Sequence, residues 1–431
     1  MTSRGFFDFP SPMPDSRSPT IVGQHDMLQR EEDARNWRER ALAVLPTGAS
    51  TGSKRPAALY GEDNSDAPTH FVAARGCHVT AVNGKSFVDC TMALGAVALG
   101  YAEPRVTHAV IAAASEGSVA GLSSWREVEL AERLCAMIPC AERAQFLKSG
   151  AEAVSAAVRL ARTYTGRDRV VASGYFGWHD WSSTSEGVPE SVRKDVVHVP
   201  FGDVSAIERA AREAGSSLAA IVLEPVVEHE PPEDWLARAR ALCDDLGAAL
   251  VFDEIKTGFR LAPGGYQQVC GVTPDLAAFG KALANGYPLA AVVGKAPLMD
   301  AARRTWISST LASEATALAA GLAVLDWHDE TDVCAKLAEI GREMRAAVER
   351  AITATDVRGV RTDGLDAMWL LRWDDAAREN RFVREALSAG VLFKRGAYNF
   401  AAIAHDDGAI APVEHAATTA LSAVRAEGDT E

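Results

Sequence analysis

An aspartate and a lysine each follow a short apolar run in the middle of the chain. Residues 248–252 are apolar and partly β-branched, and Asp253 comes directly after them. A second apolar run, residues 276–279, ends at Gly280 and Lys281. Pyridoxal phosphate chemistry requires a lysine that forms a Schiff base with the cofactor and an acid that keeps its pyridine nitrogen protonated. The pair can do this chemistry if the fold brings the two side chains together.

Both apolar runs have the length and composition of buried strands in a parallel sheet. In open α/β sheets, ligands bind outside the carboxyl ends of the strands. We therefore expect Asp253 and Lys281 to face one crevice. Taken alone, the two residues favour a surface acid at a strand end and a solvated lysine over a cofactor site.

The residues around the pair favour the cofactor site. The segment DEIKTGFR (253–260), followed by DLAAFGKALANGYPLAAVVG (275–294), resembles the class III aminotransferases of fold type I. The resemblance covers residues 70–330 well and is nearest to the branch that contains glutamate-1-semialdehyde aminomutase. It implies that Asp253 pairs with the pyridine nitrogen and that Lys281 carries pyridoxal 5'-phosphate (PLP).

A phosphate site is expected at Ser149, Gly150 and Ala151, which open a predicted helix. Free backbone N–H groups and the dipole at a helix start bind phosphate without a basic side chain, although small residues there are also common caps. In register with the family's phosphate-binding SGTEA motif, these positions become cofactor contacts. Ala151 lacks the hydroxyl that is often found there.

The resemblance implies five further site residues. Tyr175 and Ile255 would hold the two faces of the pyridine ring, and Phe176 stands where relatives usually have histidine. Glu224 corresponds to a catalytic family acid near the phenolic oxygen of the cofactor. Thr310, in SSTLASEATALAAG, matches a threonine that reaches the phosphate of the neighbouring subunit. That match implies a homodimer with shared active sites.

The candidate substrate-contacting residues lie outside these motifs. Arg55 is the nearest counterpart of a substrate-facing arginine in the aminomutase branch, and a solvated basic turn is the alternative interpretation. The other candidate pocket positions are Ser123, Ser124, Trp125, Trp178, Lys394, Arg395 and Tyr398.

The predicted elements give an α/β fold whose mainly parallel sheet is covered by helices on both faces. We expect an N-terminal arm and helix over 1–75, a large PLP-binding domain over 76–325, and the rest of a smaller α+β domain over 326–431. Asn83-Gly84 is a strong hairpin signal between 77–82 and 85–89, and this leading hairpin is assigned to the small domain. The predicted strands also include 170–172 and 221–222, and the predicted helices are 24–45, 127–137, 315–328, 332–354, 375–389 and 413–426.

The 431 residues are 48% hydrophobic and 24% charged, and the formal net charge is −14. This composition is typical of a globular chain with a large and a small domain. The negative charge argues against nucleic-acid binding and favours a cationic substrate.

The 7 cysteines are scattered and form no CxxC pair, so neither a disulfide framework nor a metal site is expected. No targeting signal and no membrane span is evident in the sequence, which favours a cytoplasmic protein.

Transamination and intramolecular amine migration use the same machinery, so the motifs leave both open. The acidic and aromatic residues favour an aminotransferase that moves an amino group from a small-molecule donor to a polar aldehyde or ketone. One such acceptor is an oxidised amino sugar of an aminoglycoside antibiotic pathway. The alternatives are a glutamate-1-semialdehyde-type 2,1-aminomutase and an ω-amino acid:2-oxo acid aminotransferase. A PLP racemase or decarboxylase is less compatible with DEIKTGFR, and a non-catalytic scaffold is less compatible with an intact Asp253 and Lys281.

Overall fold

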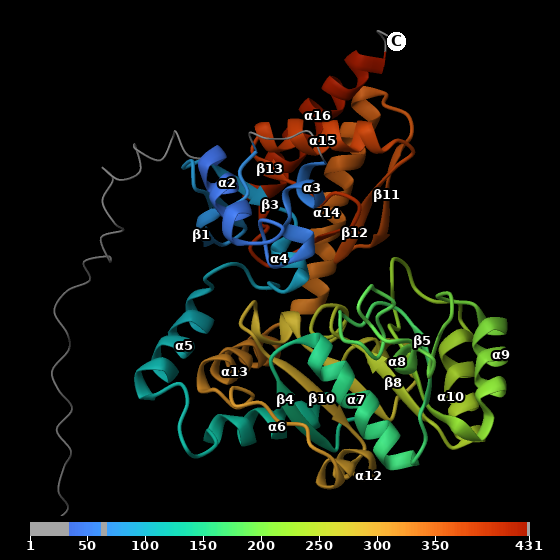
Figure 1. Ribbon diagram of the computed structural model, residues 1–431. Coiled ribbons are helices and arrows are strands. Elements are labelled where there is room, and N and C mark those ends of the chain that lie inside the picture. Colours follow the sequence, from blue (N-terminus) through green and yellow to red (C-terminus); the bar gives the residue numbers. More distant parts are fainter. Residues whose placement is uncertain (1–33, 62–66, 429–431) are drawn as a thin grey trace, which may run out of the picture.

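A seven-stranded sheet forms the centre of the larger body of the molecule (Figure 1). The computed structural model describes residues 34–61 and 67–428. The neighbouring strands, in order, are β4 (Arg143–Leu147), β10 (Ala290–Gly294), β9 (Leu276–Phe279), β8 (Ala249–Asp253), β7 (Leu218–Leu223), β5 (Arg169–Ser173) and β6 (Val196–His198). Five neighbouring strands from β9 to β6 are parallel, whereas β10 runs antiparallel to both β4 and β9. The mainly parallel sheet is therefore confirmed.

Both faces of this sheet are covered, which explains why its strands are continuous apolar runs. All six residues of β7 are buried. Ala220 and Val222 pack with residues of α7 (Gly150–Thr165), while Ile221 and Leu223 belong to the core on the opposite face. That face is covered by α6 (Trp125–Met137), α9 (Val204–Ala214) and α10 (Trp235–Leu246). The other helices of this body are α5 (Pro104–Glu116), α8 (Glu190–Arg193), α11 (Tyr266–Cys270), α12 (Ala296–Met299) and α13 (Ala315–Glu330), whereas α4 (Met92–Gly95) lies with the smaller body.

The carboxyl ends of β8 and β9 lie side by side because the two strands are parallel neighbours. Asp253 is the last residue of β8 and pairs with Ala278 of β9. The chain leaves β9 at Phe279 and enters the short helix η3 (Lys281–Ala284). The predicted juxtaposition of Asp253 and Lys281 at one sheet edge is thus present.

The smaller body combines both ends of the described chain, which Figure 1 shows as blue and red segments lying together. One sheet joins β1 (Phe71–Arg75), β2 (His78–Ala81) and β3 (Ser86–Asp89) to β13 (Val391–Leu392). The predicted hairpin therefore pairs with a strand from the far end of the chain. A second sheet contains β11 (Val360–Leu365), β12 (Met368–Trp373) and β14 (Tyr398–Phe400). The accompanying helices are α2 (Ala34–Val44), α3 (Pro56–Tyr60), α14 (Val333–Thr355), α15 (Ala376–Ser388) and α16 (Asp407–Gly428).

The ends of the chain are less completely predicted than its centre. The sequence predicts mainly helices from Glu314 on, and this region also supplies the strands β11, β12, β13 and β14. The predicted helix over 24–45 is present from Ala34 to Val44. Its first part and the predicted arm over 1–22 lie outside the described residues.

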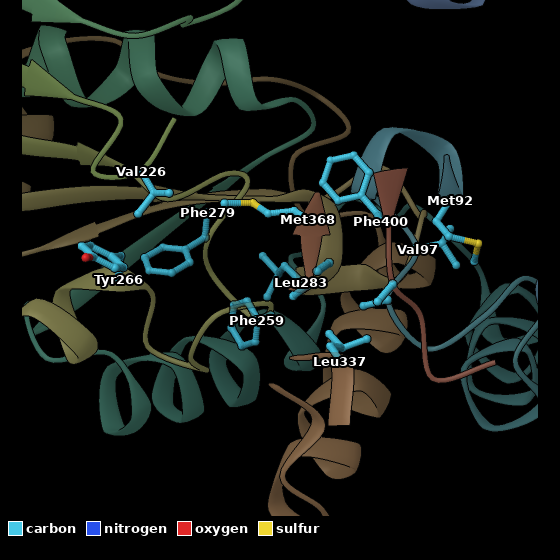
Figure 2. Close-up of a cluster of buried hydrophobic side chains, with 14 of the residues drawn as sticks. Met92, Val97, Val226, Phe259, Tyr266, Phe279, Leu283, Leu337, Met368 and Phe400 are labelled. Atoms are coloured by element: carbon cyan, nitrogen blue, oxygen red, sulfur yellow. The ribbon is translucent and has the colours of Figure 1, made fainter. Parts of the chain in front are cut away.

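A continuous apolar core connects the two bodies. Figure 2 shows Phe279 and Leu283 of the larger body near Met368 and Phe400 of the smaller body, all members of one buried cluster. Leu283 belongs to η3, the helix that begins at Lys281. The position of this lysine is therefore fixed by packing on both sides of the junction.

We predict that Gly341→Ala destabilises the protein, although alanine normally stabilises a helix by about 1 kcal/mol relative to glycine. A Cβ at this position of α14 would lie 1.9 Å from the backbone oxygen of Asp366, in the turn between β11 and β12. Relieving this overlap requires a backbone shift, which costs about 3 kcal/mol. At the control position Gly321, a Cβ would meet only side-chain ends of Leu289 and Leu130, at 3.0 and 3.1 Å. Thermal unfolding should give a clearly lower midpoint for Gly341→Ala than for Gly321→Ala, and equal midpoints would contradict the close approach.

Candidate active site

A cavity of about 400 Å³ opens at the carboxyl ends of β8 and β9. Most of the predicted cofactor residues line it, from five separate segments of the chain. They are Ser149, Gly150, Ala151, Tyr175, Glu224, Asp253, Ile255 and Lys281, together with the predicted substrate residue Trp178. Another hollow, of about 490 Å³ between the hairpin and α15, contains none of the predicted site residues.

Lys281 has a left-handed backbone, with φ of 46°. A positive φ is uncommon for a residue with a Cβ and is found preferentially at functional sites. Within the described residues, the Lys281 amine has no hydrogen-bond or ion-pair partner. Burial lowers the pKa of Lys281, and the charge of Lys256 lowers it further, while Asp253 and Glu224 oppose this shift. A partnerless amine with a lowered pKa is suited to act as a nucleophile or a base.

Asp253 is buried, and its Oδ1 accepts a hydrogen bond of 2.9 Å from the backbone N–H of Ile255. Burial raises the pKa of Asp253 to about 8, and the charge of Glu224 contributes to this rise. A buried carboxyl group in this state lacks a close cationic partner, and a protonated pyridine nitrogen would supply one. The chemistry of this position therefore fits PLP.

The start of α7 provides unpaired backbone donors. Ser149 and Glu152 form a capping box, in which Ser149 Oγ accepts from the Glu152 N–H and Glu152 accepts from the Ser149 N–H. The next two N–H groups, those of Gly150 and Ala151, have no partner among the described residues. Both residues line the cavity, and a Cβ on Gly150 would lie 3.1 Å from Ile255. These two amides can donate to the cofactor phosphate, while the Ser149 hydroxyl is occupied by the cap.

Glu224 and Lys256 line the cavity and form a second polar group with Tyr398, which contacts Lys256 from outside the cavity lining. Lys256 Nζ lies 3.0 Å from Glu224 Oε1, and Glu224 Oε2 accepts a hydrogen bond of 2.8 Å from the Tyr175 N–H. Lys256 is the fourth residue of the DEIKTGFR motif, but the motif alone predicts no role for it. Its position three residues after Asp253, on the turn that leaves β8, is the signal that could have drawn attention to it.

The two predicted aromatic residues that follow β5 lie in different environments. Tyr175 is 76% exposed and lines the cavity, in agreement with a ring-facing position at its mouth. Phe176 is 3% exposed and packs against Trp181, with ring centroids 5.6 Å apart. Phe176 does not line the cavity, so the prediction that it contacts the cofactor is corrected to a role in core packing. The Phe176 ring joins the apolar cluster between α7 and the sheet, where its burial is favourable.

The remaining predicted residues do not line this cavity. Arg55 is exposed at the start of α3, and Trp125, the first residue of α6, is 61% exposed. Arg395 donates a hydrogen bond to Asn380. Tyr398 contacts Lys256, and Thr310 is exposed in the loop before α13.

Each cavity lysine except Lys281 has an acidic partner. Lys148 Nζ lies 2.8 Å from Glu314, the N-cap of α13. Burial acts against the charge of Glu314, but hydrogen bonds from Lys148, Thr316 and Ala317 lower its pKa to about 2. No uncommitted cation other than Lys281 therefore lines the cavity in the described part of the chain.

The described residues include neither a candidate metal site nor a candidate membrane span. No group of His, Cys, Asp and Glu side chains within residues 34–61 and 67–428 is arranged to hold a metal ion. In the same ranges, no helix combines the length and hydropathy of a membrane span.

Comparison with known proteins confirms the family resemblance seen in the sequence. The family model for aminotransferase class-III matches residues 60–400. The chain is 31% identical to the 3-aminobutyryl-CoA aminotransferase of Cloacimonas acidaminovorans over 341 residues, which are 77% of this chain and 81% of that protein. It is 37% identical to the glutamate-1-semialdehyde 2,1-aminomutase of Methanothermobacter thermautotrophicus over 279 residues, 61% of this chain and 64% of the relative. The PLP-containing structure of the FumI protein of Sphingopyxis sp. MTA144 superposes with a TM-score of 0.87 at 27% identity, covering 93% of this chain and 98% of that one.

Proposed function

The chain belongs to the class III aminotransferases, and from this premise we propose that its cavity moves an amino group between a small-molecule donor and a polar carbonyl acceptor. The protein is a PLP-dependent transaminase of fold type I. The observation that carries the assignment of residues is the position of Asp253 and Lys281 in one cavity, at the ends of adjacent parallel strands.

Bound PLP supplies an electron sink for the carbanion that forms when the substrate loses a proton. Asp253 would hold the pyridine nitrogen by its negative charge, and the N–H groups of Gly150 and Ala151 would bind the phosphate. Tyr175 and Ile255, which line the same cavity, would contact the ring. Lys281, once free as an amine, would remove a proton from the substrate carbon that bears the amino group and deliver it to the aldehyde carbon of the cofactor.

The proposed enzyme is a homodimer with shared active sites. Thr310 does not line the cavity of its own chain, which agrees with a role in the site of a second copy. Large apolar side chains are exposed on nearby segments, namely Leu122 at 87%, Trp125 at 61%, Val128 at 62%, Trp306 at 80% and Leu311 at 52%. An exposed apolar surface of this kind is typical of an interface. Sedimentation equilibrium should give twice the chain mass, and a monomer that is active at assay concentration would contradict the shared site.

The proposed acceptor is an oxidised amino sugar, an aldehyde or ketone that carries further amino groups. Lys148 and Lys256 are both paired with acids, so the cavity wall offers no spare cation for a substrate carboxylate. The exposed rings of Tyr175 and Trp178 line its mouth and can contact a sugar or an ammonium group. The formal net charge of −14 also favours a cationic substrate.

A screen of acceptors tests this choice. The amine-loaded enzyme is mixed with an oxidised amino sugar, with succinic semialdehyde or with pyruvate, and the return of the aldehyde form of the cofactor is followed by absorbance. We expect kcat/KM to be at least about tenfold higher for the amino sugar, equivalent to about 1.4 kcal/mol. Faster turnover of succinic semialdehyde and pyruvate would reject the oxidised amino sugar as the acceptor.

An aminomutase is the second candidate, favoured by the 37% identity to the glutamate-1-semialdehyde enzyme. An aminomutase needs a single amino aldehyde and no separate acceptor, because the amino group returns to the same skeleton. Incubation with glutamate 1-semialdehyde alone distinguishes the two, since only the aminomutase gives 5-aminolevulinate over many turnovers.

A further inference from the structure

A second lysine is buried in the wall of the cavity that contains Lys281. Lys256 is 9% exposed, and it lines the same cavity from the turn that follows β8. The mechanism proposed above gives this lysine no task. A buried lysine that is not used for packing or catalysis is costly unless its charge is compensated.

All three N–H donors of the Lys256 ammonium group have acceptors. They are Glu224 Oε1 at 3.0 Å, the Val227 backbone oxygen at 3.2 Å and the Tyr398 hydroxyl at 3.1 Å. The ammonium also lies 4.6 Å from the centre of the Tyr398 ring. Tyr398 comes from β14 of the smaller body, and its hydroxyl donates in turn to the Val227 oxygen. Lys256 is thus held in one place by groups from two segments, the loop after β7 and the strand β14.

This arrangement keeps Lys256 charged. Burial lowers the pKa of Lys256, but the Glu224 carboxylate and Tyr398 more than offset that effect, so the net shift is upward. Since its nitrogen has no lone pair and no spare donor, Lys256 is unsuited to act as a nucleophile or a base. It is suited to act as a fixed positive charge.

Four charged groups face Lys281 from the surrounding elements. Glu224 lies at the end of β7, Asp253 at the end of β8, and Lys256 and Arg260 on the turn after β8. The two carboxylates favour the ammonium form of Lys281, whereas Lys256 and Arg260 favour the neutral amine. Lys256 is the stronger of the two cations in this effect, and it is second only to burial.

We propose that Lys256 is a positioning residue, whose fixed ammonium charge keeps Lys281 in the neutral form that bonds to the cofactor. The inference rests on the proposed role of Lys281. In the step concerned, the Lys281 nitrogen forms a C=N bond to the aldehyde carbon of PLP, the aldehyde oxygen leaves as water, and both amine hydrogens go to that water. Only the neutral amine has the lone pair for this attack.

The rate at which cofactor-free protein takes up PLP, measured against pH, tests the proposal. The rate follows the neutral fraction of Lys281, so its midpoint reports the ionisation of that amine. Lys256→Met removes the charge with little change in volume, and it also leaves Glu224 without its cation. Both changes favour protonated Lys281, so the midpoint should rise by about one pH unit and loading at neutral pH should slow about tenfold.

Two further variants separate charge from structure. Lys256→Arg retains the charge and should keep a midpoint near that of the wild type. Lys256→Gln removes the charge but can still donate a hydrogen bond to Glu224, so it should shift the midpoint in the same direction as Lys256→Met. This second uncharged variant keeps the test decisive if Lys256→Met does not fold.

The possible outcomes are distinct. If both uncharged variants load PLP normally and their midpoints are unshifted, the proposed role of Lys256 is wrong. The assignment of Lys281 is unaffected by that result. An equal shift in Lys256→Arg shows that shape rather than charge matters, and it also overturns the proposal. Wild-type protein that forms no adduct on Lys281 at any pH overturns the assignment of Lys281, and with it the role of Lys256.

Discussion

Lys281→Ala should lose transamination by about 10⁴-fold or more, because it removes both the attachment point of the cofactor and the general base. The neighbouring lysines of the cavity cannot replace it, since Lys148 is paired with Glu314 and Lys256 with Glu224. The variant should also lack the absorbance band of the lysine-bound cofactor. Both results are measured by mixing the loaded protein with the best donor from a screen and recording spectra over time.

Lys194→Ala is a matched control for this change, because Lys194 is exposed at the end of α8, and it should keep wild-type activity. A band that survives in Lys281→Ala, or activity within tenfold of the wild type, would place the cofactor on another residue.

Asp253→Asn should lower kcat/KM by about 10²–10³-fold, the range measured when one electrostatic partner of a reacting group is removed. The amide has the same shape and can still accept from the Ile255 N–H, so the fold should be unaffected. It carries no charge to hold the proton on the pyridine nitrogen. Without the bound cofactor the pKa of Asp253 is raised to about 8, and the incoming pyridinium restores the ionised form.

This variant should still attach PLP at Lys281, so the loss must appear in the step that removes a proton from the substrate. A donor deuterated at the reacting carbon measures this, because the isotope effect on the amine-forming half-reaction should increase. Asp245→Asn, at an exposed position of α10, is the control. Full activity in Asp253→Asn would refute its pairing with the pyridine nitrogen.

The elements around the site could be predicted because their signals are local. β9 coincides with the predicted run 276–279, and β8 and α13 begin within one residue of the predicted positions. Apolar runs that stop at a charged residue are sufficient to indicate buried strands of a parallel sheet.

The strands of the smaller body could not be predicted in the same way. β11 contains Asp363 and Gly364, which favour turns, and it is a strand because it pairs with the apolar β12. β13 has only two residues, and its partner β3 lies near the other end of the chain. Such pairings depend on tertiary context that no local pattern contains.

The site residues also fall into two groups: some are marked by local sequence motifs, and others are positioned by distant parts of the chain. Asp253, Lys281 and the start of α7 are marked by motifs and line one cavity. Lys256 was given no role from the sequence, because two of its partners, Val227 and Tyr398, lie 29 and 142 positions away in the chain. Phe176 was assigned from its resemblance to a family position, but its ring packs in the core against Trp181.

The residue that carries the cofactor can be identified by chemical labelling. The protein is loaded with PLP, reduced with borohydride, digested, and analysed by mass spectrometry. We expect one pyridoxyl group per chain, on the peptide that contains Lys281. A label on Lys148 or Lys256, or no label on any lysine of the cavity, would contradict the account.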